Sequence, residues 1–139
     1  MKKKIYMIIL SIVAILIIIA TFLYMNLNKT KVDGSIHLYV TICENNEIIE
    51  VIDKDVDFYE NEKLIDVLNR HLTIQEGTGS NKGMIIGIND CIITNLNSYY
   101  YRLVVNCEFA TLGAWDLTLN DKDSVRITYT STSDWSVGC

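Results

Sequence analysis

The sequence lacks the residue patterns that most catalytic and metal centres require. It has only two histidines and four cysteines, and none of them is spaced as C-x-x-C or H-x-x-x-H, which argues against a zinc site. No nucleophile elbow, phosphate-binding loop or zinc-hydrolase helix motif occurs either. His37 and His71 fall on the outer face of a predicted strand and at the end of a predicted helix. We therefore expect no enzyme activity, no catalytic residues and no resident cofactor.

One segment begins like a calcium-binding loop but does not continue as one. Aspartates alternate over residues 53–57. A calcium loop of this type then needs glycine at its sixth position and glutamate at its twelfth. This chain has Phe58 and Leu64 at those two positions, so the sequence predicts no metal site.

Basic residues are scarce outside the N-terminus. Three of the 12 basic residues are Lys2, Lys3 and Lys4, which leaves 9 against the 17 acidic residues and a net charge of −8. All the acidic residues lie beyond position 30. This excess of negative charge argues against nucleic acid as a partner and favours a well-solvated surface.

Residues 1–28 have the composition of a membrane anchor. Ile5 to Met25 is an uncharged run of 21 residues rich in Ile and Leu, and a helix of that length covers the roughly 30 Å of a bilayer's hydrocarbon core. The lysines before it favour a cytoplasmic N-terminus. We therefore predict a single-pass anchor in the cell membrane, with the C-terminal domain extracytoplasmic.

A cleaved signal peptide is the alternative to a retained anchor. Its apolar region is usually about 7 to 15 residues long and ends in a small-x-small site, whereas Ala20 is followed here by Thr21, Phe22 and Leu23. No cysteine near the end of the run supports a lipoprotein cleavage site. We expect an uncleaved anchor, followed by a polar tether over residues 29–35.

Alternating apolar residues after the tether predict a β-hairpin and then a helix. Apolar and polar residues alternate over residues 36–43, the period of a strand with one face on a core. A turn at Glu44-Asn45-Asn46 leads to a partner strand at residues 48–52. Over residues 61–72 the apolar residues share one stripe at helical spacing, which predicts an amphipathic helix.

The rest of the chain reads as short strands joined by turns. Residues 77–83 are rich in glycine and are predicted to form a mobile loop. Short strands are expected at residues 84–88 and 92–93, and a turn at residues 95–98.

The strongest strand signals lie in residues 98–130. Residues 99–105 are aromatic and β-branched, residues 106–108 form a turn, and residues 120–123 form another before the alternating strand at 124–130. The predicted fold is therefore α+β, a small antiparallel or mixed β-sheet with one packed amphipathic helix in a β-grasp-like arrangement, preceded by a single transmembrane helix.

The order of these segments resembles the transcobalamin C-terminal-like domain family of bacterial surface proteins. The resemblance rests on residues 58–68, 86–89, 99–106, 112–114 and 117–125, within a domain that we place at residues 36–131 with a tail at 132–139. The chain departs from the family at Cys107 and Lys122, where glycine is usual, and it has no Trp in the aromatic strand. A Cβ at Cys107 disfavours the positive φ that glycine permits.

The resemblance implies a ligand-contact role, because this domain helps to enclose cobalamin in transcobalamin-type proteins. We therefore predict a membrane-anchored, extracytoplasmic binding module for a small ligand such as cobalamin or for a surface partner. The alternative is a structural, adhesion or assembly domain of the cell envelope that binds no small ligand.

Tyr100 and Trp115 are the predicted binding residues. By strand period Tyr100 points away from the core, and Trp115 lies beside Gly113 and Ala114 in a turn region. The loops at residues 77–83 and 109–115 are expected to contact the partner, because recognition usually sits on loops held by a rigid scaffold. Four residues are expected only to hold the fold: Leu64, Leu68, Val104 and Val125.

Four cysteines in an extracytoplasmic domain predict at least one disulfide among Cys43, Cys91, Cys107 and Cys139. Strand period places Cys43 on an outer face, and Cys139 is expected to tie down the tail. Free thiols are the alternative, because sequence alone does not show which pairs are close enough to bond.

Overall fold

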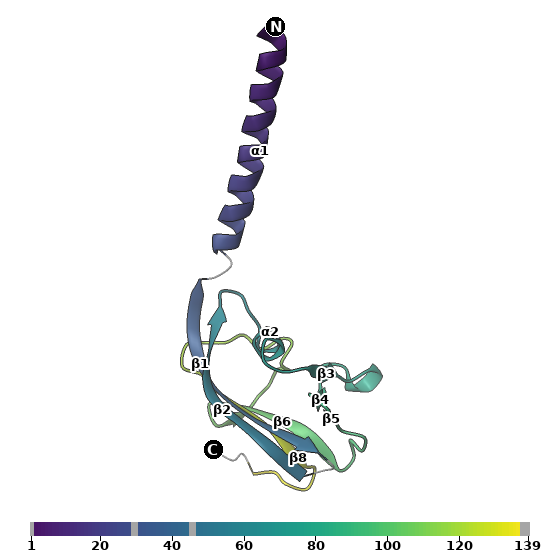
Figure 1. The fold of residues 1–139 in the computed structure, drawn as a ribbon. Coiled ribbons are helices and arrows are strands. Elements are labelled where there is room, and N and C mark those ends of the chain that lie inside the picture. Colours follow the sequence, from purple (N-terminus) through teal and green to yellow (C-terminus); the bar gives the residue numbers. More distant parts are fainter. Residues whose placement is uncertain (1, 29–30, 45–46, 137–139) are drawn as a thin grey trace. The chain divides into compact units, whose positions relative to one another are not determined.

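The computed structural model of the protein describes residues 2–28, 31–44 and 47–136 (Figure 1). The chain divides into two compact units, Met1–Lys31 and Val32–Cys139. The first unit holds helix α1 (Lys2–Asn28), and the strands all lie in the second.

Helix α1 runs through the whole apolar run from Ile5 to Met25, so the helical conformation of that run is confirmed. On this helix the structure describes the side chains of Tyr6 and residues 11–24, all of them exposed. Over the described residues, no helix combines the length and the apolar character needed to span a bilayer. That the run crosses a membrane stays a prediction.

Five strands form the main sheet, in the order β2-β1-β8-β6-β7. Their bounds are β1 Val32–Glu44, β2 Glu47–Tyr59, β6 Tyr99–Val105, β7 Glu108–Phe109 and β8 Ser124–Ser131. β1 and β8 pair in parallel, and the other neighbouring strands are antiparallel. The predicted α+β fold with a mixed sheet is confirmed, while the β-grasp-like arrangement stays a prediction.

The first hairpin is confirmed, but its strands are longer than predicted. β1 starts at Val32, so residues 32–35 of the predicted tether belong to the strand. β2 continues through the aspartate-rich segment to Tyr59, because β1 pairs with it along that whole length and so holds residues of low β propensity in a strand. The predicted turn residues Asn45 and Asn46 lie outside the described residues.

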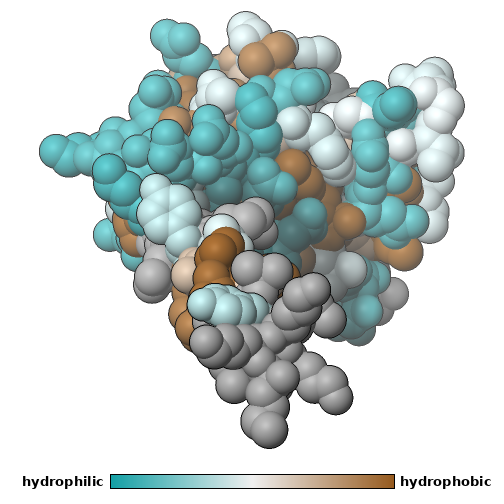
Figure 2. Space-filling view, turned by 90° about the horizontal axis from the view of Figure 1, so that it is seen from above, coloured by the Kyte–Doolittle hydropathy of each residue, from teal (hydrophilic) through white to brown (hydrophobic). Residues whose placement is uncertain are grey.

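One face of the main sheet carries the core. The alternating apolar residues of the two central strands are no more than 1% exposed: Ile36, Leu38, Val40, Val125 and Ile127. Full burial of one such side chain stabilises a fold by about 1.5 to 3 kcal/mol. The surface differs from this core. The face that Figure 2 shows is mostly hydrophilic, with hydrophobic residues exposed only in places.

Helix α2 (Leu64–Asn69) packs on this core and is shorter than the predicted helix over residues 61–72. Asn61 has a φ of 65° and Lys63 is extended, with φ −92° and ψ 164°, so neither residue can belong to the helix. The first helical amides, of Leu64 and Ile65, donate to the carbonyls of Leu117 and Ala114 at 3.1 and 3.0 Å. The predicted apolar stripe is confirmed, since its members are all buried: Leu64, Val67, Leu68 and Leu72.

A second, three-stranded sheet of order β3-β4-β5 completes the cover of the core. Its strands are β3 Ile74–Glu76, β4 Ile85–Ile88 and β5 Cys91–Ile92. β4 and β5 lie where the sequence predicts strands, whereas β3 was not predicted. The loop at residues 77–83, predicted to lack regular structure, holds a turn of 3₁₀ helix, η1 (Gly79–Asn81).

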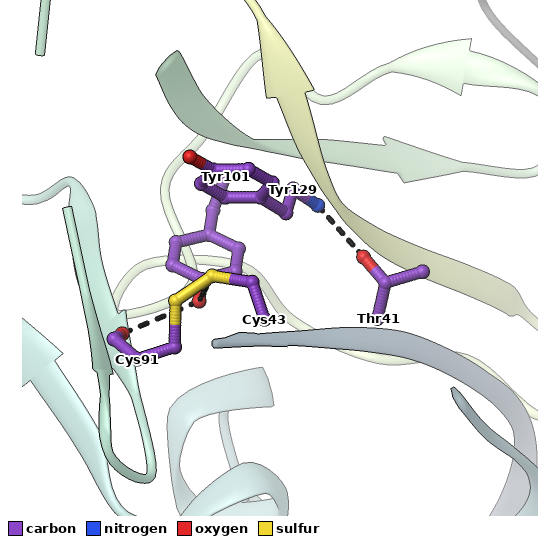
Figure 3. Close-up of a disulfide and its surroundings, with 5 residues drawn as sticks. All are labelled: Thr41, Cys43, Cys91, Tyr101 and Tyr129. Carbon is purple, nitrogen blue, oxygen red and sulfur yellow. Dashed lines mark hydrogen bonds between the residues drawn. A yellow bond between two sulfur atoms is a disulfide. The ribbon is translucent and has the colours of Figure 1, made fainter. Parts of the chain in front are cut away.

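Cys43 of β1 and Cys91 of β5 form a disulfide, with their Cα atoms 5.4 Å apart (Figure 3). This bond joins the main sheet to the second sheet. The Tyr101 hydroxyl lies beside it, donating to the Cys91 carbonyl oxygen at 3.3 Å and lying 3.4 Å from Cys43 Sγ. Burial raises the pKa of Tyr101 to about 12, so the hydroxyl keeps its proton at neutral pH.

The prediction of at least one disulfide is confirmed, but the outward placement of Cys43 is wrong. Cys43 is only 2% exposed, because the pairing of β1 with β2 shifts register between Ile42 and Cys43 and such a bulge re-aims side chains. Cys107 is also disulfide-bonded, and none of the described cysteines is free. Cys139, expected to tie down the tail, lies outside the described residues.

Two turns adopt left-handed conformations at residues that carry side chains. Asn106 and Cys107 have φ of 51° and 68°, as a type I′ hairpin turn requires, and Lys122 has 68°. The positive φ is therefore kept at Cys107 despite its Cβ, at a cost of the order of 1 kcal/mol. Buried Asp123 links both turns, since Oδ1 accepts from Asn106 Nδ2 at 2.8 Å and Oδ2 from the Asn120 amide at 2.9 Å.

Candidate binding groove

A groove of about 350 Å³ opens beside β6, and we call it the edge groove. It is lined by residues 83–85, 100–103 and 109–114. Successive side chains of a strand point to opposite faces of its sheet. Four consecutive β6 residues can therefore line one groove only if the groove runs along the edge of the strand.

The edge of β6 is open because its outer neighbour is short. β7 pairs only with Val104 and Val105. The Ala110 amide then donates to the Leu103 carbonyl at 3.1 Å, after which the chain leaves the sheet. The four residues before Val104 consequently have a strand partner on one side only, β8.

The two loops predicted to contact a partner meet at this groove. A Cβ built on Gly113 would lie 2.7 Å from the Gly83 carbonyl oxygen, so only glycine allows this close approach. Gly83 has a φ of 86°, and its amide donates to Glu76 Oε1 at 2.9 Å. These contacts fix the wall of the groove that faces β6.

An exposed group of apolar side chains continues from the edge groove, and we call it the aromatic patch. It is formed by Met84, Leu96, Tyr100, Phe109, Thr132 and Trp135. Trp135 is 76% exposed, Phe109 43% and Met84 41%. Three of these residues, Met84, Tyr100 and Phe109, also line the edge groove, so the two features form one continuous site.

Arg102 holds the segment that carries Trp135. Its side chain is 7% exposed, and its Nη2 donates to Thr130 Oγ1 at 3.1 Å. Its Nη1 donates to the carbonyl oxygens of Asp134 and Ser136. The Ser136 amide and, less strongly, Arg102 lower the pKa of the Asp134 carboxyl. Strand period places Arg102 on the outer face, and these contacts explain why it is nevertheless buried.

The two predicted site residues fall in different places. Tyr100 lines both the edge groove and the aromatic patch. Trp115 follows Ala114, the last residue of the groove lining, but it is partly buried and packs against the core. Sequence reasoning did not single out Met84, Phe109 or Trp135, although Phe109 begins one predicted contact loop and Met84 directly follows the other.

The histidines lie away from this site. His37 has Nε2 2.9 Å from Asp53 Oδ1 and Nδ1 2.8 Å from Asp55 Oδ1, and these carboxylates, above all Asp55, which accepts a hydrogen bond from the ring, raise the pKa of His37. Desolvation lowers the pKa of His71. Within the described ranges no three His, Cys, Asp or Glu side chains are grouped so that they could hold a metal ion.

The sequence of residues 61–131 matches a family described as "Domain of unknown function (DUF4430)". The chain belongs to this family. The DUF4430 match runs from just before α2 to the end of β8, so it contains the whole lining of the edge groove. The β1–β2 hairpin and two residues of the aromatic patch, Thr132 and Trp135, lie outside it. Among curated proteins, no sequence matches this chain.

The fold of this DUF4430 chain is transcobalamin-like. A crystal structure of haptocorrin in complex with Cbi matches it with a TM-score of 0.52 and 14% sequence identity. The match covers 73% of this chain and 26% of the haptocorrin chain. At this identity the likeness concerns the fold alone, and the chain corresponds to a minor part of the haptocorrin molecule.

Proposed function

We propose that the protein is a membrane-anchored, extracytoplasmic binding module whose aromatic patch takes a small ligand with a flat, largely apolar face. One observation carries the proposal: Tyr100, Phe109, Met84 and Trp135 come from separate segments and gather in one exposed patch. Soluble domains seldom expose aromatic side chains together without a binding role. The resemblance to a cobalamin-enclosing domain, and a structural neighbour that holds Cbi, support a corrinoid as the ligand class.

The chemistry of the patch suits a planar ligand. Aromatic side chains offer large contact areas with few rotatable bonds, so little entropy is lost when they order against a partner. Stacked or edge-to-face aromatic contacts add about 0.5 to 1.5 kcal/mol each beyond the burial of apolar area. Arg102 takes a supporting part, because its bonds to Asp134 and Ser136 hold Trp135 at the patch.

The membrane part of the proposal rests on the sequence of α1. The uncharged run from Ile5 to Met25 and the lysines in front of it support a retained anchor with the domain outside. A tag placed at the C-terminus should be digested by protease added to intact protoplasts, and the purified chain should retain its first 25 residues. A protected tag, or a shortened chain released into the medium, would show that this topology is wrong.

Titration of the full chain with cobalamin tests the ligand. We expect a rise in melting temperature and saturable binding, and we expect Phe109→Ala to weaken binding about tenfold, since burial of an aromatic side chain contributes about 1.5 to 3 kcal/mol. Phe109 is exposed, so the melting temperature without ligand should stay within a few degrees. Ile49→Ala, at an exposed position of β2 away from the patch, is the control and should bind normally.

Trp115→Ala tests the second predicted site residue. The sequence predicts weaker ligand binding with a nearly unchanged melting temperature. Trp115 packs partly against the core, so the variant can also give the opposite result. If the domain is destabilised but its folded fraction binds with normal affinity, then Trp115 does not belong to the site, and Tyr100 and Phe109 remain in it.

An interaction domain without a small ligand is the second candidate function. Three isoleucines support it, because Ile48, Ile49 and Ile92 are 50% to 59% exposed, and Ile49 and Ile92 line the same surface hollow beside the disulfide. Exposed apolar groups rimmed by acidic residues mark protein contacts in many domains. This candidate predicts no thermal shift with corrinoids.

A further inference from the structure

We propose that the open edge of β6 in the edge groove is a docking site for an extended strand of a partner protein, uncharged and apolar at alternate positions. This inference goes beyond the small-ligand proposal, because it uses the main chain of β6 whereas the small ligand would use aromatic side chains. Addition of a strand to an exposed sheet edge is an established mode of peptide recognition.

The hydrogen bonds on the other side of β6 show which main-chain groups face the groove. Tyr101 lies opposite Tyr129 of β8, but the Tyr129 amide donates to Thr41 Oγ1 at 2.8 Å (Figure 3). The two residues are therefore a non-hydrogen-bonded pair, and the N–H and C=O of Tyr101 point to the outer edge. The N–H and C=O of Leu103, two residues further along the strand, also point to the outer edge.

The bonds at the end of β7 agree with this orientation. The Leu103 carbonyl accepts the Ala110 amide on the outer side, and the Asn106 amide, three residues on, donates to the Ser124 carbonyl on the β8 side. Among the described residues, no hydrogen bond reaches the Leu103 amide or the N–H and C=O of Tyr101 from the outer side. The edge groove thus presents a row of main-chain donors and an acceptor spaced for one more antiparallel strand.

The other edge of the same sheet is protected, and β6 is not. Natural sheets commonly guard an open edge with charged side chains. β2 forms the opposite edge, and it carries a row of exposed charged residues: Glu47, Glu50, Asp53, Lys54, Asp55 and Asp57. The open part of β6 has one charged residue, Arg102, and that side chain is buried against residues 130–136.

The walls of the groove define the side chains of the occupant. Met84, Phe109 and Leu112 are 41% to 49% exposed and apolar, and no free charge stands among the lining residues. Polar recognition is therefore left to the main chain, while alternate apolar side chains of the incoming strand can cover these walls. A charged strand would lose hydration without gaining a partner.

A peptide with the sequence of β8, residues 124–131, carrying Arg126→Thr so that it is uncharged, acetylated and amidated, is the probe. This sequence already pairs antiparallel with β6 on its other edge, so it has the required strand character. Hydrogen exchange of single amides is followed by NMR on the full chain in detergent micelles. At saturating peptide we expect exchange at Tyr101 and Leu103 to slow about tenfold or more, with Tyr100 and Arg102 unchanged because they already face β8.

The control is the same peptide N-methylated at every central amide, which keeps the side chains, removes the peptide's own donors and places methyl groups that block close approach to the main chain of β6. It should protect neither amide. The proposal is overturned if millimolar peptide leaves Tyr101 and Leu103 unprotected, if both peptides protect them equally, or if the protected amides lie on β2. Failure of cobalamin to bind would not change any of these results, so the two proposals are tested separately.

Discussion

Replacing both Cys43 and Cys91 with alanine is expected to lower the free energy of unfolding by about 4 kcal/mol. The two residues are 48 positions apart, and a cross-link that closes a loop of this length removes about that much conformational entropy, in free-energy terms, from the unfolded chain. The bond also connects β1 to β5, so its loss removes the covalent link between the two sheets. Denaturant unfolding of the variant and the parent, both under oxidising conditions, measures the difference.

Tyr101→Phe distinguishes the contribution of the disulfide to stability from that of the neighbouring hydroxyl. That variant keeps the disulfide and loses only the hydroxyl that contacts the Cys91 carbonyl and Cys43 Sγ. We expect a loss of about 1 kcal/mol, the usual contribution of one hydrogen bond. A double cysteine variant no less stable than Tyr101→Phe would contradict the idea that the cross-link, rather than local packing, stabilises this region.

Leu68→Ala is expected to cost about 2 to 5 kcal/mol, because it removes a fully buried side chain and leaves a cavity. Leu68 is 0% exposed and lies on the face of α2 that packs on the core. Leu112→Ala makes the same chemical change at a site that is 49% exposed and should stay within about 0.5 kcal/mol of the parent. Thermal and denaturant unfolding of both variants give the comparison.

The difference between these two leucine variants is the informative quantity. If both variants lower the free energy of unfolding equally, then burial in the core does not determine the size of the effect, and the packing described for α2 is wrong. If Leu112→Ala costs more than 1 kcal/mol, the wall of the edge groove is part of the core rather than an open surface. Either result would also alter the account of the binding site.

Local pattern was enough to predict the strands and the buried stripe of α2. Strict alternation marks one buried face, and β8 and the first part of β1 follow it, whereas the aromatic and β-branched residues of β6 predict that strand by composition. β3 was missed because three residues, Ile74–Glu76, are too few to show a period. The parallel pairing of β1 with β8 could not be predicted, since neither strand carries a local signal of its distant partner.

Errors of placement arose where tertiary contacts override alternation. The face of Cys43 was predicted wrongly because a register shift in the hairpin precedes it. The burial of Arg102 depends on residues 130–136 folding back over it. The first feature depends on how β1 pairs with β2 and the second on residues distant in sequence, and the periodicity of a single strand carries no information about either.

The candidate site was predicted only in part for the same reason. Tyr100 and the two contact loops were recognised from strand period and glycine content. Met84, Phe109 and Trp135 become a patch only when β4, β7 and the segment after β8 are brought together. The open edge of β6 likewise follows from the shortness of β7, which a turn prediction does not reveal.

The parallel pair at the centre of the main sheet also sets the order of events during biosynthesis. β1 is the first strand to be made and β8 the last, and His37 through Val40 pair with Ser124 through Ile127. A nascent chain therefore cannot complete the sheet until nearly all of the domain has left the ribosome, and closing so long a loop is slow. Until then the edge of β1 that pairs with β8 has no partner, and an unpaired strand edge makes a nascent chain prone to aggregation.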